Sequence, residues 1–280
     1  MMVLPVARFT FKEAVRKKVL LGAAVLSIGF LALFAIGNQL AYADFSRSKD
    51  AGYIAVWQPV IAGGMAIAGL YVVNFLAGLL AIFTAVGTIS SEIDSGTLHA
   101  IVPKPVRRWE IVLGKWLGFA LMLVFYVALM AGALMLIVGA IWGILPPNPL
   151  LGIALMALCA LLLLSLTILG STLLATVANG IVVFMLYGVG LMGGFIEQLG
   201  SLVRNDTMVN IGIFTSLLIP SDVLWKMVSY TLQPPELLAR SVTTPIFGGS
   251  PPSPAMIGYA IAYAVAALAL AILVFKRRDL

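Results

Sequence analysis

The sequence predicts an all-α integral membrane protein with six transmembrane helices, forming a single transmembrane domain over residues 1–280. Three observations lead to this fold class. Hydrophobic residues make up 62% of the chain and charged residues only 10%, whereas a soluble domain carries about 25% charged residues. The apolar residues form blocks long enough to cross a bilayer. The net charge of +6 gathers at the ends of these blocks, rather than along a stripe that could bind nucleic acid.

The spans follow from the length of the apolar blocks. A helix rises about 1.5 Å per residue, so about 20 apolar residues are needed to cross the hydrocarbon core. Six blocks meet this requirement, at residues 19–37, 60–85, 116–145, 150–177, 181–196 and 255–275. The first block also resembles a cleavable signal peptide ending near residues 41–43, but its apolar run is too long for one, and an uncleaved span is expected.

The boundaries between the middle spans are predicted from helix-breaking residues. Three prolines among residues 146–149 separate the third span from the fourth. The fourth and fifth spans are expected to be separated at residues 178–180, where the Ala-Asn-Gly sequence is a turn signal. The Gly-Ser-Thr sequence at residues 170–172 is a competing turn. The number of crossings is the same for either position.

The distribution of lysine and arginine predicts the orientation of the spans. Cytoplasmic loops of membrane proteins carry an excess of these residues. Twelve of the 17 lie on one side of a six-span chain, in the N-terminal segment, in the loop between the second and third spans, and in the C-terminal tail. Both termini are therefore expected to be cytoplasmic.

The outer segment at residues 197–254 is longer than a simple connection. It contains an apolar stretch at residues 209–218 that is too short to span a bilayer. Pro220, Ser221 and Asp222 follow, and they can begin a helix that runs to Tyr230. Residues 243–254 are rich in Gly, Pro and Ser and predict an irregular loop.

The predicted spans contain no Asp, Glu, Lys, Arg or His. Such residues usually mark ion paths and proton relays, so their absence argues against a proton-coupled carrier, a haem protein or an intramembrane protease. Cys159 is the only cysteine, which excludes an intrachain disulfide or a cysteine metal site. No phosphate-binding loop occurs, so no cofactor is expected in this chain.

A few polar residues do lie inside the predicted spans, and they have two interpretations. The first is hydrogen bonding between helices or to the helix backbone, and the second is a polar patch that faces a substrate. The first is the more general property of helical bundles. These residues are Asn74, Ser165, Thr167, Ser171, Thr172 and Tyr187. Gly190 and Gly194 form a G-x-x-x-G pattern, which is typical of close helix packing.

The loop at residues 91–115, between the second and third spans, has an apolar feature on a polar background. Asp94 or Ser95 can cap a short helix that Pro103 ends. Leu98, Ile101 and Val102 would then share one helix face. Such a face suits a groove on a soluble partner, and it suits packing on the protein's own spans equally well.

The same loop resembles the signature of type-2 ABC transporter permeases. In that family a Glu precedes Gly-Thr-Leu, then a Pro, an Arg, and a Gly-Lys pair that opens the third span. The matching residues here are Glu92, Gly96, Thr97, Leu98, Pro105, Arg108, Gly114 and Lys115. Six spans with both termini inside also match the layout of that family.

The resemblance implies a function and a set of partners. It implies that this chain is the non-catalytic permease of a plasma-membrane exporter, paired with a second permease chain. Separate ATP-binding subunits would bind ATP and Mg²⁺. A coupling helix would dock into them, through Glu92, Gly96, Thr97, Leu98, Ile101, Val102, Pro105 and Arg108. Short re-entrant helices would lie between the fifth and sixth spans.

The resemblance also implies an amphipathic helix at residues 5–18 that lies on the membrane surface. Arg8, Lys12 and Arg16 recur at i, i+4 spacing and share one stripe of such a helix. The stripe suits anionic lipid headgroups or an acidic surface of the ATPase. A solvated basic flank of the first span explains each of these residues equally well.

Two functions from other classes remain as alternatives. One is a membrane scaffold or assembly factor without transport activity. The other is an enzyme at the membrane surface, in which Glu92, Asp94 and His99 gather as metal ligands. The sequence does not identify the transported substrate.

Overall fold

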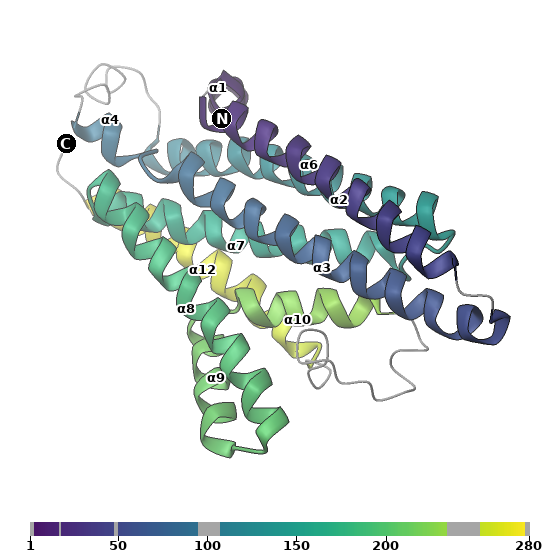
Figure 1. Cartoon of the computed structure of the whole chain (residues 1–280). Coiled ribbons are helices and arrows are strands. Elements are labelled where there is room, and N and C mark those ends of the chain that lie inside the picture. The colour runs from purple at the N-terminus through teal and green to yellow at the C-terminus, as the bar shows by residue number, and fades with distance from the viewer. Residues whose placement is uncertain (1–2, 17, 48–49, 95–106, 234–252, 278–280) are drawn as a thin grey trace.

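The computed structural model describes residues 3–16, 18–47, 50–94, 107–233 and 253–277. Every regular element in these ranges is a helix (Figure 1). The helices are α1 (Val3–Arg16), α2 (Lys18–Ser46), α3 (Ala51–Ala85), α4 (Ser90–Asp94), α6 (Arg108–Trp142), α7 (Pro149–Leu173), α8 (Thr176–Val203), α9 (Asp206–Leu218), α10 (Ser221–Leu232) and α12 (Ala255–Arg277).

Six of the described helices are long and apolar enough to cross a membrane, which confirms the predicted number. They are α2, α3, α6, α7, α8 and α12. Several extend beyond the predicted apolar blocks, because a helix propagates into polar flanks until a residue caps it. The helix α3 begins at Ala51, where the carboxylate of Asp50 accepts hydrogen bonds from the backbone N–H groups of Gly52 and Tyr53. The helix α6 begins at Arg108, two turns before the predicted third span.

The predicted boundary between the fourth and fifth spans is wrong in position. The helix α7 ends at Leu173 and α8 begins at Thr176, so residues 178–180 lie inside α8. The reason is that Asn179 connects helices instead of making a turn. Its buried side-chain amide donates to the backbone carbonyls of Val86 (2.8 Å) and Thr167 (3.0 Å). Gly170, in the competing turn signal, lies within α7 and leaves room for the Asn179 carbonyl group.

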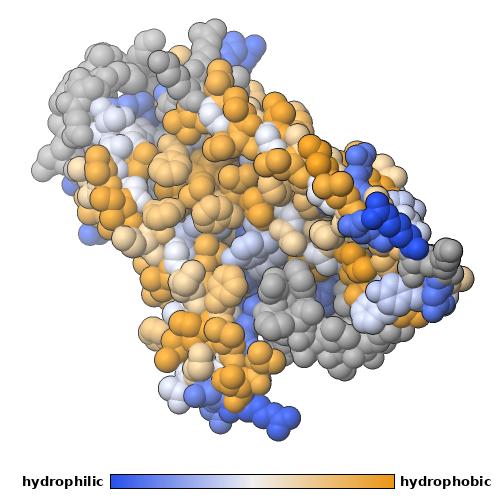
Figure 2. Space-filling model, in the orientation of Figure 1, coloured by the Kyte–Doolittle hydropathy of each residue, from blue (hydrophilic) through white to orange (hydrophobic). Residues whose placement is uncertain are grey.

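The helix α7 is the centre of the bundle. It packs against α3, α6, α8, α10 and α12, and most of it is buried. In contrast, only a small part of α2 is buried. The visible face is mainly hydrophobic across its middle, with hydrophilic groups near the ends and at the tip of the α8–α9 hairpin (Figure 2). This distribution is expected of a helical bundle whose outer surface contacts lipid.

The helix α1 packs along the start of α6 through two glycines. A Cβ atom on Gly114 would lie 2.7 Å from the side chain of Val6, and one on Gly118 would lie 2.7 Å from the backbone oxygen of Ala7. Only glycine therefore allows this approach. The opposite face of α1 exposes Leu4 and Phe9 together with Arg8 and Lys12.

The segment between the fifth and sixth spans folds as two short helices. The helix α9 pairs with the end of α8 as a hairpin that projects from the bundle (Figure 1). A bend of 104° then directs α10 back against α7. Its start after Pro220 confirms the helix predicted there, and α9 includes the short apolar stretch. The predicted irregular loop at residues 243–254 lies almost wholly outside the described residues.

Replacing Gly118 with valine is expected to displace α1 from α6. The added side chain would overlap α1, and such overpacking lowers the free energy of unfolding by about 1–3 kcal/mol. Gly132→Val is the matched control on the same helix, because no atom lies within 4 Å of a Cβ placed there. Detergent-induced unfolding followed by circular dichroism measures both variants. Equal stability of the two variants would contradict the proposed role of Gly118 in docking α1.

Candidate coupling site and buried charge cluster

A buried lysine connects the start of α6 to the end of α3. Lys115 is 8% exposed, and its ammonium group lies 2.5 Å from a carboxylate oxygen of Glu92 in α4. The same ammonium group donates a hydrogen bond of 2.6 Å to the backbone carbonyl of Thr88, in the turn between α3 and α4. Lys115 and Glu92 both belong to the permease-like signature, and the fold brings them into contact.

Polar groups of α7 and α8 hold the same turn from the other side. The hydroxyl of Ser171 accepts hydrogen bonds from the backbone N–H groups of Ile89 (2.9 Å) and Ser90 (3.2 Å). The Ser90 hydroxyl contacts that of Thr176 at 2.8 Å. These side chains replace the backbone bonds that the helix loses at the turn. Ser171 therefore has the interhelical role that the sequence predicted.

Other polar residues of the spans bond to the backbone of their own helix. The hydroxyls of Ser165, Thr167 and Thr172 donate to carbonyls three or four residues earlier. Ser165 also accepts from the indole N–H of Trp116 at 2.9 Å, which joins α7 to α6. The interpretation as contacts within and between helices is confirmed for Ser165, Thr167, Ser171 and Thr172, whereas the buried Tyr187 hydroxyl has no hydrogen-bond partner among the described residues.

Arg108 connects the first turn of α6 to the last turn of α12. Its guanidinium donates to the backbone carbonyls of Phe275 (3.3 Å) and Lys276 (3.2 Å). The last carbonyls of a helix have no partner within that helix, so a guanidinium is a suitable cap. The start of α6 is thus bonded to both α4 and α12.

The remaining predicted site residues are only partly described. Gly96, Thr97, Leu98, Ile101, Val102 and Pro105, with the predicted coupling helix around them and His99, lie outside the described residues. Arg8 and Lys12 are exposed on α1. Arg16 is the last residue of α1, but its side chain is not among those described.

A second charged group is buried where α8 and α10 pack together, beyond the end of the predicted fifth span. The ammonium group of Lys226 in α10 lies 2.7 Å from a carboxylate oxygen of Glu197 in α8 and 2.8 Å from one of Asp222. Lys226 is 8% exposed and Asp222 is 6% exposed. We call these three residues the charge cluster.

The sequence contained weak signals of this cluster. Glu197 follows the predicted fifth span by one residue, and α8 continues through it to Val203. Asp222 and Lys226 are four residues apart and therefore share one face of α10. What the sequence did not indicate is that α10 turns back into the bundle, because residues 220–232 are not an apolar block.

The G-x-x-x-G pattern of α8 is where the charge cluster meets that helix. A Cβ atom on Gly190 would lie 3.2 Å from the hydroxyl oxygen of Ser221, and one on Gly194 would lie 2.0 Å from a carboxylate oxygen of Asp222. The pattern therefore serves close packing, as predicted, and the neighbour that it admits is polar.

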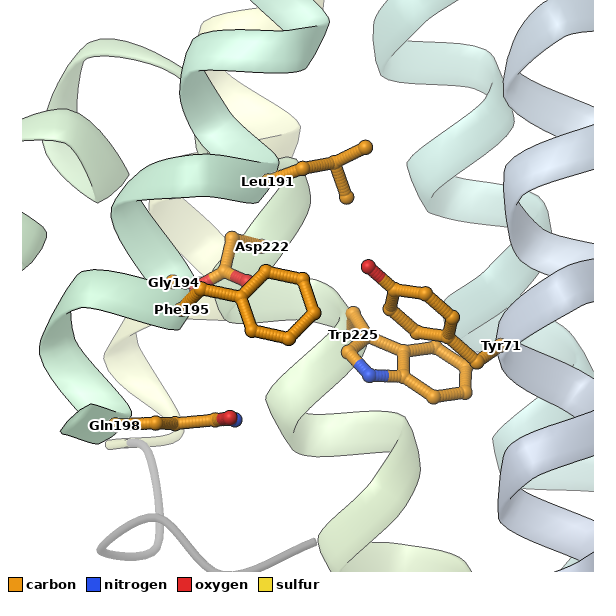
Figure 3. A pocket seen from close by; sticks show the side chains of 7 residues that line it. All are labelled: Tyr71, Leu191, Gly194, Phe195, Gln198, Asp222 and Trp225. Carbon is orange, nitrogen blue, oxygen red and sulfur yellow. The ribbon is translucent and has the colours of Figure 1, made fainter. Parts of the chain in front are cut away.

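A small cavity lies beside the charge cluster, between α3, α8 and α10 (Figure 3). Its volume is about 40 Å³. Three of its walls are aromatic rings, from Tyr71, Phe195 and Trp225. Tyr71 meets Trp225 at a centroid distance of 5.1 Å and Phe195 at 6.4 Å, both nearly perpendicular. The other lining residues are Leu191, Gly194, Gln198 and Asp222.

The described residues form a helical integral membrane protein with six candidate spans. The chain belongs to the ABC-2 family transporter proteins, whose family model matches residues 4–280. This membership makes it a membrane permease of the ABC transporter class. No curated protein sequence matches the chain.

The contact between Glu92 and Lys115 is expected to be energetically coupled. In a double-mutant cycle with Glu92→Gln and Lys115→Met, we expect a coupling energy of about 0.5–3 kcal/mol, because the pair is largely buried. The matched control is the exposed pair Asp44 and Arg47, 2.9 Å apart, for which we expect less than about 0.5 kcal/mol. Unfolding in mixed micelles measures both cycles. The same small value for both pairs would show that Lys115 does not specifically bind Glu92.

Proposed function

We propose that this chain is the permease subunit of an ATP-driven exporter and that a separate ATP-binding subunit docks on the segment at residues 91–115. The observation that best supports this proposal is the ion pair of Glu92 and Lys115, which joins the two ends of that segment. A partner that displaces the segment would therefore move α3 and α6 together. The apolar face of Leu98, Ile101 and Val102 suits a groove on such a partner.

The proposed mechanism transmits ATP-driven motion through bonds at the start of α6. ATP and Mg²⁺ bind in the partner, and closure of two such subunits moves the docked segments. Lys115 carries the motion to the turn after α3, and Arg108 carries it to the end of α12. The helices α3 and α12 both pack on the central α7. Two arrangements of this bundle, biased by the ATPase, suffice for alternating access.

The membrane context is also part of the proposal. Positive charge at the α1, α4–α6 and α12 ends supports a cytoplasmic location for both termini, in the plasma membrane. Arg8 and Lys12 would contact anionic headgroups while Leu4 and Phe9 enter the interface. A second permease chain, identical or homologous, would complete the transport path.

Replacing Leu98 with aspartate is expected to release the ATPase. A charge on the apolar docking face is costly to bury, so co-purification with a co-expressed ABC ATP-binding subunit should fall about tenfold or more. Thr207→Asp is the control, because it places the same charge at the exposed first turn of α9, far along the chain from the docking segment. The readouts are the amount of bound ATPase and its ATP hydrolysis in lipid nanodiscs.

Three outcomes of this experiment are informative. Loss of the ATPase only with Leu98→Asp supports the docking model. Unchanged assembly and turnover in both variants contradicts it. If wild-type protein binds no ATPase under mild conditions, the membrane scaffold becomes the better function.

The orientation gives a separate prediction. In a Cys159→Ser background, Thr207→Cys should react with a membrane-impermeant maleimide on intact cells, whereas Lys12→Cys should react only after permeabilisation. Both positions are exposed, and the native Cys159 is buried. Labelling of Lys12→Cys on intact cells would place the N-terminus outside and contradict the orientation.

A further inference from the structure

We propose that the cavity between α3, α8 and α10 binds the primary ammonium group of an amphiphilic organic cation, with Asp222 as its counter-charge and Tyr71, Phe195 and Trp225 as its walls. The proposal rests on the proposed function, because it names a substrate class for the permease. The binding itself is a property of this chain alone.

The first argument is the charge balance. Two carboxylates, Glu197 and Asp222, share one ammonium group, so the ionised cluster has one negative charge in excess. Excess buried charge is costly unless a partner compensates it. None of the residues that line the cavity is basic, and Asp222 is the one carboxylate among them. A cation in the cavity would complete the balance at Asp222.

The second argument is the chemistry of the walls. Tyr71 extends from α3 toward Phe195 and Asp222, and Trp225 lies against Tyr71 (Figure 3). Aromatic faces attract cations, most strongly when the site is desolvated. The Tyr71 hydroxyl and the Gln198 amide oxygen add neutral acceptors to the charged acceptor of Asp222. A primary ammonium group has three N–H donors that such acceptors can bond.

The third argument is the size of the cavity. A water molecule requires about 10–15 Å³ of such space, whereas pockets for drug-sized ligands measure about 300–1,000 Å³. The volume of about 40 Å³ therefore admits an ammonium group and its first carbon, but no larger body. Phe195, at the rim, is 41% exposed, so the apolar remainder of the ligand would lie along the outer surface of α8.

The lining also argues against a metal ion. Calcium requires six to eight oxygen ligands, and magnesium requires a near-octahedral set. The cavity presents a single carboxylate, and no described group of three His, Cys, Asp or Glu residues is close enough to hold a metal ion. Aromatic walls cannot replace the missing oxygen ligands.

The position of the cavity connects it to the proposed coupling site. Tyr71 belongs to α3, whose end is bonded to Lys115 through Thr88. Lys226 joins α10 to α8 through Glu197. Movement of α3 relative to α8 and α10 would shift the aromatic ring of Tyr71 toward or away from those of Phe195 and Trp225, and so open or close the cavity around the ligand. Binding and ATP-driven motion would thus share one helix.

The experiment uses the full-length chain in lipid nanodiscs, without ATP or ATPase. The probe is 4-(aminomethyl)benzophenone, which carries a primary ammonium group, and the control probe is 4-ethylbenzophenone, in which CH₃ replaces NH₃⁺. After illumination, labelled peptides are identified by mass spectrometry. We expect the charged probe to label α8 around Phe195 and Gln198 about tenfold more than the neutral probe does, and excess ethylammonium to compete.

Variants then test the role of each wall. Asp222→Asn should reduce the specific labelling about tenfold, while Asp206→Asn, the same change at an exposed site, should leave it unchanged. Because Asp222→Asn also weakens the charge cluster, Tyr71→Phe provides a milder test. It removes one hydroxyl and should weaken competition by ethylammonium several-fold while thermal stability stays near that of the wild type.

Equal labelling by the two probes would overturn the proposal, as would specific labelling that neither Asp222→Asn nor Tyr71→Phe reduces. These outcomes are independent of the docking test. If the cation binds as expected but Leu98→Asp leaves ATPase assembly unchanged, the permease mechanism fails and the binding site remains. If the ATPase docks but the probe does not bind, only the assignment of substrate class fails.

Discussion

A buried backbone N–H or carbonyl group that leaves a helix needs a new hydrogen-bond partner, and in the turn after α3 side chains supply these partners. In the turn after α3, Lys115 and Asn179 donate to the carbonyls of Thr88 and Val86, and the Ser171 hydroxyl accepts from two N–H groups. This turn is the point where α3, α6, α7 and α8 are joined. A substitution there would therefore disturb four helices rather than one.

Two buried lysines have comparable roles at different levels of the bundle. Lys115 joins α6 to α4 and to the turn that precedes it, and Lys226 joins α10 to α8. Lys115 lies between the Glu92 carboxylate and the Thr88 carbonyl, and Lys226 lies between the carboxylates of Glu197 and Asp222. Neither ammonium group is therefore left unpaired. Breaking such a contact leaves a buried charge without compensation, which is more costly than the loss of an exposed pair. Contacts of this kind can hold a helix in one of two discrete positions.

The sequence and the structure differ most where a residue has two possible uses. Asn179 followed by Gly180 is a turn signal by local propensity, but the buried amide bonds to α3 and α7 and the chain stays helical. Glu92 and Lys115 were both recognised by their place in the signature, although their contact was not foreseen. Asp222 and Lys226 were interpreted as outer-side charges, because a helix that re-enters the bundle leaves no apolar block in the sequence.

The number of spans, their approximate positions and the start of the helix after Pro220 could be predicted from the sequence, because hydropathy and helix-breaking residues act over neighbouring positions. Three other features come from helix packing: Gly114 and Gly118 admit α1, Gly190 and Gly194 admit polar groups, and a cavity with aromatic walls lies beside Asp222. These features depend on pairs of residues far apart in the chain. Their contact follows from how whole helices pack, and no local pattern records it.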